Sequence, residues 1–165
     1  MKLRKLMAKD AELMLEWMHD KDVVLWMQSD FASKTLSDCE RFIANNQECG
    51  ADLNLAIVDE SDEYMGTVSL KHIDKEAKNA EFAITVRKGA MGKGFSQYGM
   101  KEILQIGFYE LGLESIFWCV SIENKRAIRF YDKSDAERID DIPEKIMNSY
   151  SSEQLEKMIW YVVNK

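Results

Sequence analysis

The sequence predicts an α/β (α+β) fold in which helices flank a mixed, mostly antiparallel central sheet. Three successive runs rich in β-branched and apolar residues occupy the middle of the chain, separated by acidic or Asn/Lys turns. Segments with helical spacing of apolar residues precede and follow them, and strands alternate with helices in the second half. The 165 residues, 46% of them hydrophobic, are predicted to form one domain over residues 1–165.

The first half begins with an alternating segment, residues 2–7, which predicts a short strand. Residues 11–20 ("AELMLEWMHD") place four apolar side chains on one helical face, and Asp10 is positioned to cap that helix. Residues 23–35 are expected to be irregular, and a second helix is expected over residues 38–48. Residues 53–60, 63–74 and 80–87 are the three central strands, which we expect to be antiparallel neighbours.

The second half continues with a glycine-rich segment and a helix from about Phe95 to near Gly112. Residues 115–121 ("SIFWCVS") predict a fifth strand, and residues 123–133 predict another helix. The tail passes from a helical stretch into a last strand over residues 158–163.

Composition excludes several classes of protein. The net charge of −7 argues against a binder of nucleic-acid backbones, which needs clustered Lys and Arg. No 18-residue apolar run or signal-peptide pattern is present, so we expect neither a membrane span nor a leader. The three cysteines are odd in number and lack metal-ligand spacing, which favours a reducing, cytoplasmic location and no metal site.

Glycines concentrate in one place: three of the eight in the chain fall between Gly89 and Gly94. This segment joins a strand to a helix, where unpaired backbone amides and the helix dipole favour an anion. Glycine lets the backbone approach a ligand closely, and Lys93 adds a positive charge. We therefore predict a diphosphate cradle formed by the amides of about Met91 to Ser96.

Other interpretations of this segment are weaker. A Walker A loop requires Ser or Thr after Gly-Lys, but Gly94 follows Lys93. The dinucleotide fingerprint lacks its third glycine, because Gln97 stands there. A glycine-rich turn without any ligand remains an alternative.

Two motifs resemble those of the GCN5-related N-acetyltransferases (GNAT). The segment "MGKGFS" is similar to their Gln/Arg-x-x-Gly-x-Gly/Ala signature, with departures at the first and last positions. The segment "NKRAIRFYDK" resembles their Asn-x-x-Ala block, with Tyr131 in step. Residues 3–20 are similar to the ribosomal-protein and amino-sugar N-acetyltransferase branch. The resemblance implies that the cofactor-binding residues include Met91, Gly92, Lys93, Gly94, Phe95 and Ser96.

The resemblance further implies acetyl-CoA as co-substrate and splayed fourth and fifth strands. The pantetheine arm is then expected to bond to the backbone of Ile84 and Val86 like an added strand. Asn124 is expected to contact that arm or the first turn of its own helix, with helix capping as the alternative.

Amine acetylation requires a base. Several GNAT members carry a Glu at the start of the strand that corresponds to residues 80–87, and Glu81 matches it. The alternative for Glu81 is a solvated position at the strand end, and His72 is the second candidate base. Tyr131 is expected to protonate the departing CoA thiolate, or else to be a buried aromatic residue.

The acceptor pocket is expected from residues 22–31 and 141–154, with Trp26, Met27 and Phe31 as lining residues. The predicted function is acetyl transfer to a primary amine by direct attack in a ternary complex. Candidate acceptors are a small amine, an amino sugar or a protein N-terminus, and the protein is expected to be a monomer or homodimer. The alternatives are a non-catalytic acyl-CoA-binding module and a nucleotide-binding interaction domain.

Overall fold

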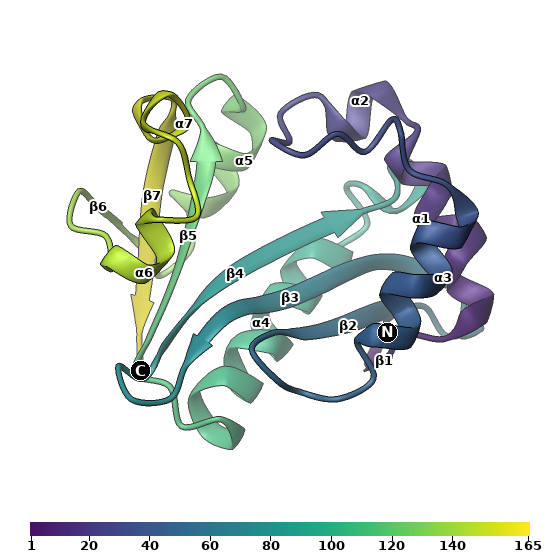
Figure 1. Cartoon of the computed structure of the whole chain (residues 1–165), viewed down its shortest axis with the longest axis horizontal. Helices are drawn as coiled ribbons and strands as arrows, with labels where there is room; N and C mark the ends of the chain where they lie inside the picture. Colours follow the sequence, from purple (N-terminus) through teal and green to yellow (C-terminus); the bar gives the residue numbers. More distant parts are fainter.

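A computed structural model describes all residues, 1–165, and contains one seven-stranded sheet (Figure 1). The strand order is β1-β2-β3-β4-β5-β7-β6, and every neighbouring pair is antiparallel except β4 and β5. The strands are β1 (Lys2–Lys5), β2 (Leu53–Val58), β3 (Tyr64–Asp74), β4 (Asn79–Val86), β5 (Ser115–Ser121), β6 (Glu137–Ile139) and β7 (Met158–Asn164).

Helices cover both faces of the sheet. They are α1 (Ala11–Met18), α2 (Lys21–Val24), α3 (Leu36–Asn45), α4 (Phe95–Gln105), α5 (Lys125–Tyr131), α6 (Glu144–Met147) and α7 (Ser152–Glu156), with short helical turns η1 (Ala8–Asp10), η2 (Lys88–Ala90) and η3 (Ile106–Glu110). Because strand side chains alternate, β2 sends Ile57 into the cluster under α4 and Ala56 and Val58 into the cluster under α1 and α3. None of these helices has the length and apolar character needed to cross a bilayer.

The predicted mixed α/β fold is confirmed, and several element boundaries differ. Asp10 does not cap α1, because its carboxylate accepts hydrogen bonds from Arg4 and from the Met7 amide instead. Thr35 caps α3, three residues before the expected start of that helix. The additional elements are α2, which begins just before the segment expected to be irregular and ends within it, the π-helical turn η3, and β6 and α6 after Lys133.

The sheet opens between β4 and β5. These two strands are paired only where Asn79–Glu81 lies beside Ser115–Phe117. Beyond that point β4 continues along β3, while β5 continues along β7, so the two strands diverge from a common apex (Figure 1). The result is a wedge-shaped opening that interrupts the sheet, as the family resemblance implied for the fourth and fifth strands.

Close packing of β3 against β4 requires glycine at position 66. A Cβ added to Gly66 would lie 2.3 Å from the Thr85 carbonyl oxygen, and a backbone atom cannot move away cheaply. We expect Gly66→Ala to lower the free energy of unfolding by about 3 kcal/mol, measured by urea denaturation. Gly89→Ala is the matched control, since nothing lies within 4 Å of its added Cβ. Equal stability of the two variants would contradict the packing described for β3 and β4.

Candidate active site

Glu81 lies at the apex of the gap, as the last β4 residue paired with β5. Only 2% of its surface is exposed, and both carboxylate oxygens have a polar side-chain partner. Oε2 lies 3.0 Å from His72 Nδ1, and Oε1 accepts a hydrogen bond from the Tyr150 hydroxyl. Lys71 Nζ is 3.6 Å from Oε1. The alternative of a solvated glutamate at the strand end is therefore wrong, because a carboxylate this buried persists only with such partners.

A β-bulge brings His72 to this carboxylate. Lys71 is paired with Glu81 across β3 and β4, so in a regular strand His72 would point to the opposite face. The register shifts between Lys71 and Asp74, and His72 takes a φ of +52°, which non-glycine residues rarely adopt. The His72 amide donates to Asp52 Oδ1 at 2.9 Å and holds this conformation. As a result, two adjacent residues of β3 both reach Glu81.

Tyr150 connects the two diverging strands. It belongs to the segment between α6 and α7. Its hydroxyl lies 3.5 Å from Cys119 Sγ of β5 and donates a hydrogen bond to Glu81 Oε1 of β4. Its ring packs edge-on against Trp160, with the ring centroids 5.2 Å apart. Burial, together with the charges of Cys119 and Glu81, raises the pKa of Tyr150, so its hydroxyl stays protonated and donates. Tyr150 is a site residue that no local sequence motif marks.

Cys119 is not an activated nucleophile. Burial raises the pKa of its thiol to about 11, and the thiol donates to the Tyr150 hydroxyl. At neutral pH the group is therefore a neutral thiol in the wall of the site.

Tyr131 lies on the other face of the sheet. Its ring packs 5.2 Å from that of Trp118, which precedes Cys119 in β5 and so points to the opposite side. Phe130 and Tyr161 complete an aromatic group around it. Burial raises the pKa of Tyr131, which keeps its hydroxyl protonated. Tyr131 therefore lies on the face of the sheet opposite to Cys119 and the Tyr150 hydroxyl.

The glycine-rich turn stands before α4, at the open end of the gap. Gly92 has a φ of +76° and Gly94 a φ of +86°, values that explain why glycine occupies both positions. Lys93 is exposed and forms no ion pair. Five amides of this turn make no hydrogen bond within the chain: those of Gly92, Gly94, Phe95, Ser96 and Gln97. Unpaired amides at the positive end of a helix dipole suit a phosphate group.

The start of α5 lies next to this turn. Arg126 Nη1 is 3.3 Å from Met91 Sδ, so the glycine-rich turn and α5 meet at the open end of the gap. Asn124 caps α5, because its Oδ1 accepts the Ala127 amide at 3.1 Å. Ile84 and Val86 pack into the hydrophobic cluster under α4, while the edge of β4 beyond Glu81 has no strand partner toward β5.

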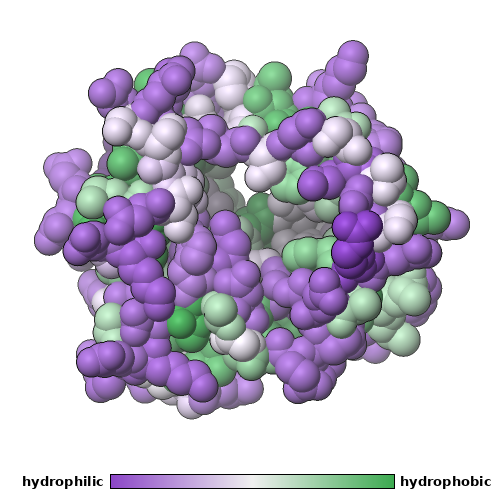
Figure 2. All heavy atoms as spheres, in the orientation of Figure 1, coloured by the Kyte–Doolittle hydropathy of each residue, from purple (hydrophilic) through white to green (hydrophobic).

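Two segments meet over the Glu81 face. Gln154 Nε2 donates to Gln28 Oε1 at 3.2 Å, which joins α7 to the loop after α2. In that loop Phe31 packs edge-on against Trp17, Met27 is half-buried, and Trp26 is 36% exposed. The structure thus brings together the two segments from which the sequence predicted an acceptor pocket. Figure 2 shows this face hollowed between the C-terminal elements and the N-terminal helices, with mostly hydrophilic residues around the hollow.

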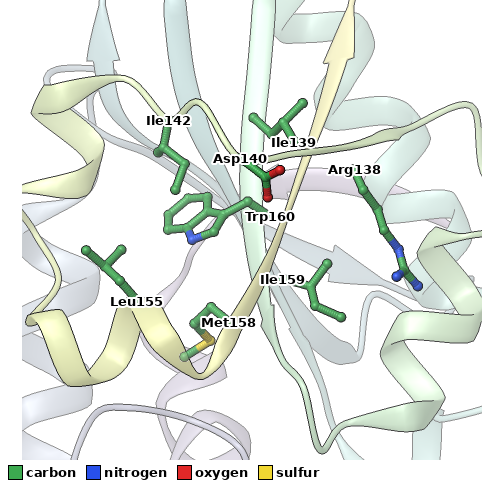
Figure 3. Close-up of a pocket in the computed structure, with 8 residues that line it drawn as sticks. All are labelled: Arg138, Ile139, Asp140, Ile142, Leu155, Met158, Ile159 and Trp160. Carbon is green, nitrogen blue, oxygen red and sulfur yellow. The ribbon is translucent and has the colours of Figure 1, made fainter.

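A separate cavity of about 340 Å³ lies beside β6, β7 and α7 (Figure 3). Six of its eight lining residues are hydrophobic, and Trp160 is shared with the ring contact to Tyr150. None of Glu81, His72 and Tyr131 lines this cavity.

The fold and the site define an acyl-transfer enzyme of a known family. Residues 1–137 match the family described as acetyltransferase (GNAT) domain, and the chain belongs to it as an N-acetyltransferase. Similar curated proteins include an uncharacterised N-acetyltransferase, p20, of Bacillus licheniformis. It is 28% identical over 130 residues, which cover 77% of this chain and 73% of that protein.

Spermidine acetyltransferases also resemble this chain. The spermidine N(1)-acetyltransferase of Vibrio cholerae is 25% identical over 108 residues, or 66% of this chain and 61% of that enzyme. The crystal structure of the spermidine N-acetyltransferase from Vibrio cholerae with CoA and spermine superposes with a TM-score of 0.81. It is 18% identical and covers 99% of this chain and 94% of that chain, a likeness that concerns the fold. The predicted ribosomal-protein or amino-sugar branch is therefore corrected, since the named relatives are spermidine acetyltransferases.

Proposed function

We propose that this enzyme transfers the acetyl group of acetyl-CoA to a primary amine of a polyamine, by direct attack in a ternary complex. The observation that carries the proposal is the gap between β4 and β5. It has a buried, hydrogen-bonded carboxylate at its apex and a turn with five unpaired amides at its open end. The two chemical groups that amine acetylation needs, an anion site and a base, therefore share one gap.

The donor side uses backbone more than side chains. The diphosphate of acetyl-CoA sits on the unpaired amides between Gly92 and Ser96, with the Lys93 side chain beside it. The pantetheine arm runs along the unpaired edge of β4 and bonds to the backbone of Ile84 and Val86, in the manner of an added strand. Asn124 keeps its side-chain NH₂ group for the same arm while its oxygen caps α5. This placement puts the thioester near the apex of the gap.

The proton of the acceptor amine goes to Glu81. The Tyr150 hydroxyl stands between this carboxylate and β5, so it donates its proton to Glu81 while it takes one from the ammonium group. The neutral nitrogen then attacks the thioester carbon, a C–N bond forms, and the C–S bond breaks. The sulfur leaves with its electron pair and takes a proton from Tyr131, and Tyr131 is reprotonated by the second proton that the nitrogen loses as the amide forms. Burial raises the pKa of Tyr131, and a buried site also disfavours the thiolate form of CoA. The pKa values of the phenol and the thiol therefore rise together, and the proton transfer between them stays nearly balanced.

The acceptor is a cation of the polyamine class. The two segments that meet over Glu81, residues 22–31 and 141–154, contain five acidic residues and one basic residue, Lys145, which is paired with Asp74. Together with the net charge of −7, they favour a multiply charged amine over a phosphorylated acceptor. The names of two similar proteins, which are spermidine acetyltransferases, support the same class. Trp26, Met27 and Phe31 supply apolar surface for the methylene segments between the amines.

Turnover against a panel of amines tests this proposal. The purified enzyme with acetyl-CoA is offered spermidine, spermine, a nucleotide-linked amino sugar and a peptide with a free N-terminus. Thiol release gives the rates, and mass spectrometry identifies the products. We expect kcat/KM for the polyamines to be at least about tenfold higher than for the others, which corresponds to about 1.4 kcal/mol of discrimination. A preference for the amino sugar would overturn the acceptor class. Binding of acetyl-CoA without any turnover would favour the acyl-CoA-binding module.

A further inference from the structure

Glu81 cannot release a proton directly into water. Its side chain is almost fully covered, and each oxygen already has a protein partner. Around Oε1 the partners are the Tyr150 hydroxyl and the Lys71 ammonium, and both are donors. Tyr150 can deliver a proton to the carboxylate, but to remove one it would first have to be a phenolate, a form that burial disfavours. Only the imidazole on Oε2 is able to accept.

We propose that His72 is the relay through which the proton of each acceptor amine leaves Glu81 for the solvent. This inference rests on the proposed function and adds to it the route of the proton after the amine is deprotonated. The route runs from Glu81 Oε2 to His72 Nδ1 over 3.0 Å, and from His72 Nε2 to Ser149 Oγ over 3.3 Å. Ser149 is exposed, and 35% of the His72 side chain is exposed, so the route begins in the buried apex and ends in water.

The backbone conformation that turns the His72 side chain toward Glu81 has an energetic cost. A φ of +52° at a histidine costs about 1–2 kcal/mol relative to an ordinary strand conformation. The bulge and the bond from the His72 amide to Asp52 maintain it. A histidine needed only for packing would have no reason to leave the regular strand, in which its side chain would point away from Glu81.

The charged groups around the ring fit a relay. Glu81 and Lys71 face it from β4 and β3, Tyr150 and Ser149 come from the segment before α7, and Asp52 holds its amide. Asp74, at the end of the bulge, is paired with Lys145 at 3.0 Å. One proton moves in each cycle: it leaves the ammonium nitrogen, resides on the Glu81–His72 pair, and departs from Nε2 into water. No other bond changes in this step.

Replacement of His72 by glycine, with imidazole added back, tests the relay. Glycine accepts the positive φ without strain and leaves room for an imidazole molecule. We expect kcat of His72→Gly with acetyl-CoA and spermidine to fall by about 10²-fold, the lower end of general acid–base contributions. Added imidazole should raise the kcat of His72→Gly at least about tenfold. This increase should scale with the concentration of neutral imidazole, because the neutral form is the one that acts as a base. His19→Gly, at the other histidine of the chain, is the control and should keep the wild-type rate with or without imidazole.

The outcomes separate this inference from the proposed function. No wild-type turnover would defeat the proposed function itself. An active wild type, with a folded His72→Gly variant that is slow and does not respond to imidazole, would overturn the relay alone. If His72→Gly does not fold, His72→Asn tolerates the same φ and has no imidazole to carry the proton. Its kcat should fall by about 10²-fold, as for His72→Gly, while its affinity for acetyl-CoA stays unchanged. A wild-type kcat for His72→Asn would also overturn the relay.

Discussion

Glu81→Gln is expected to lower kcat for polyamine acetylation by about 10³-fold while the affinity for acetyl-CoA changes little. Glutamine keeps the size of the side chain, and its amide oxygen can still accept the Tyr150 hydroxyl. It cannot take up a proton, so the ammonium group of the acceptor stays protonated and does not attack. Steady-state rates and calorimetric titration with acetyl-CoA give the two quantities separately.

The control for this substitution is Glu137→Gln, at an exposed glutamate of β6 that forms no ion pair. It removes the same charge from the protein and should keep the wild-type rate. The two variants should have similar far-ultraviolet circular dichroism. A kcat for Glu81→Gln within about threefold of the wild-type value would remove Glu81 as the base. The proton would then have to leave the amine by another route.

Gly94→Glu is expected to weaken the binding of acetyl-CoA by at least about 10²-fold. The substitution places a carboxylate beside the amides that hold the diphosphate. The protein should still fold, because an added Cβ at Gly94 meets only Met1 Cε, at 3.9 Å. The positive φ of +86° adds a strain of about 1–2 kcal/mol to the folded state.

Gly94→Gln separates charge from strain. It carries the same backbone strain and almost the same volume as Gly94→Glu, without the negative charge. We expect both variants to lose a similar free energy of unfolding, and Gly94→Gln to bind acetyl-CoA at least about tenfold more tightly than Gly94→Glu at low ionic strength. Equal affinities would mean that no phosphate group lies beside this turn. Calorimetric titration of the two variants, alongside urea denaturation, provides the comparison.

Local patterns predicted most of the fold. The runs of β-branched residues in β2, β3 and β4 specify strands because they fit a half-buried sheet, and the run "SIFWCVS" coincides with β5. The start of α4 at Phe95 follows from the glycines before it. The divergence of β4 from β5 came from the family resemblance, since periodicity gives no information about which strands separate.

The composition of the site depends on long-range contacts that no local pattern contains. Tyr150 is 69 residues from Glu81 in the chain, and it arrives there through α6, which the sequence did not predict. His72 was identified only as a second candidate base, and a regular strand would place it on the face opposite to Glu81. The bulge that reverses this orientation depends on Asp52, a residue of a different loop. Asp10 was assigned to capping, but Arg4 provides a stronger, charged partner.

Calorimetric titration of the wild-type enzyme with acetyl-CoA, with Mg-ATP as the control ligand, tests the central claim most directly. The claim is that the gap between β4 and β5, with the glycine-rich turn at its open end, is a binding site for acetyl-CoA. The predicted result is saturable binding of acetyl-CoA at one site per chain, with no comparable heat from Mg-ATP. A folded protein that does not bind acetyl-CoA would contradict the claim, and the roles proposed for Glu81, His72 and Tyr131 would have to be abandoned with it.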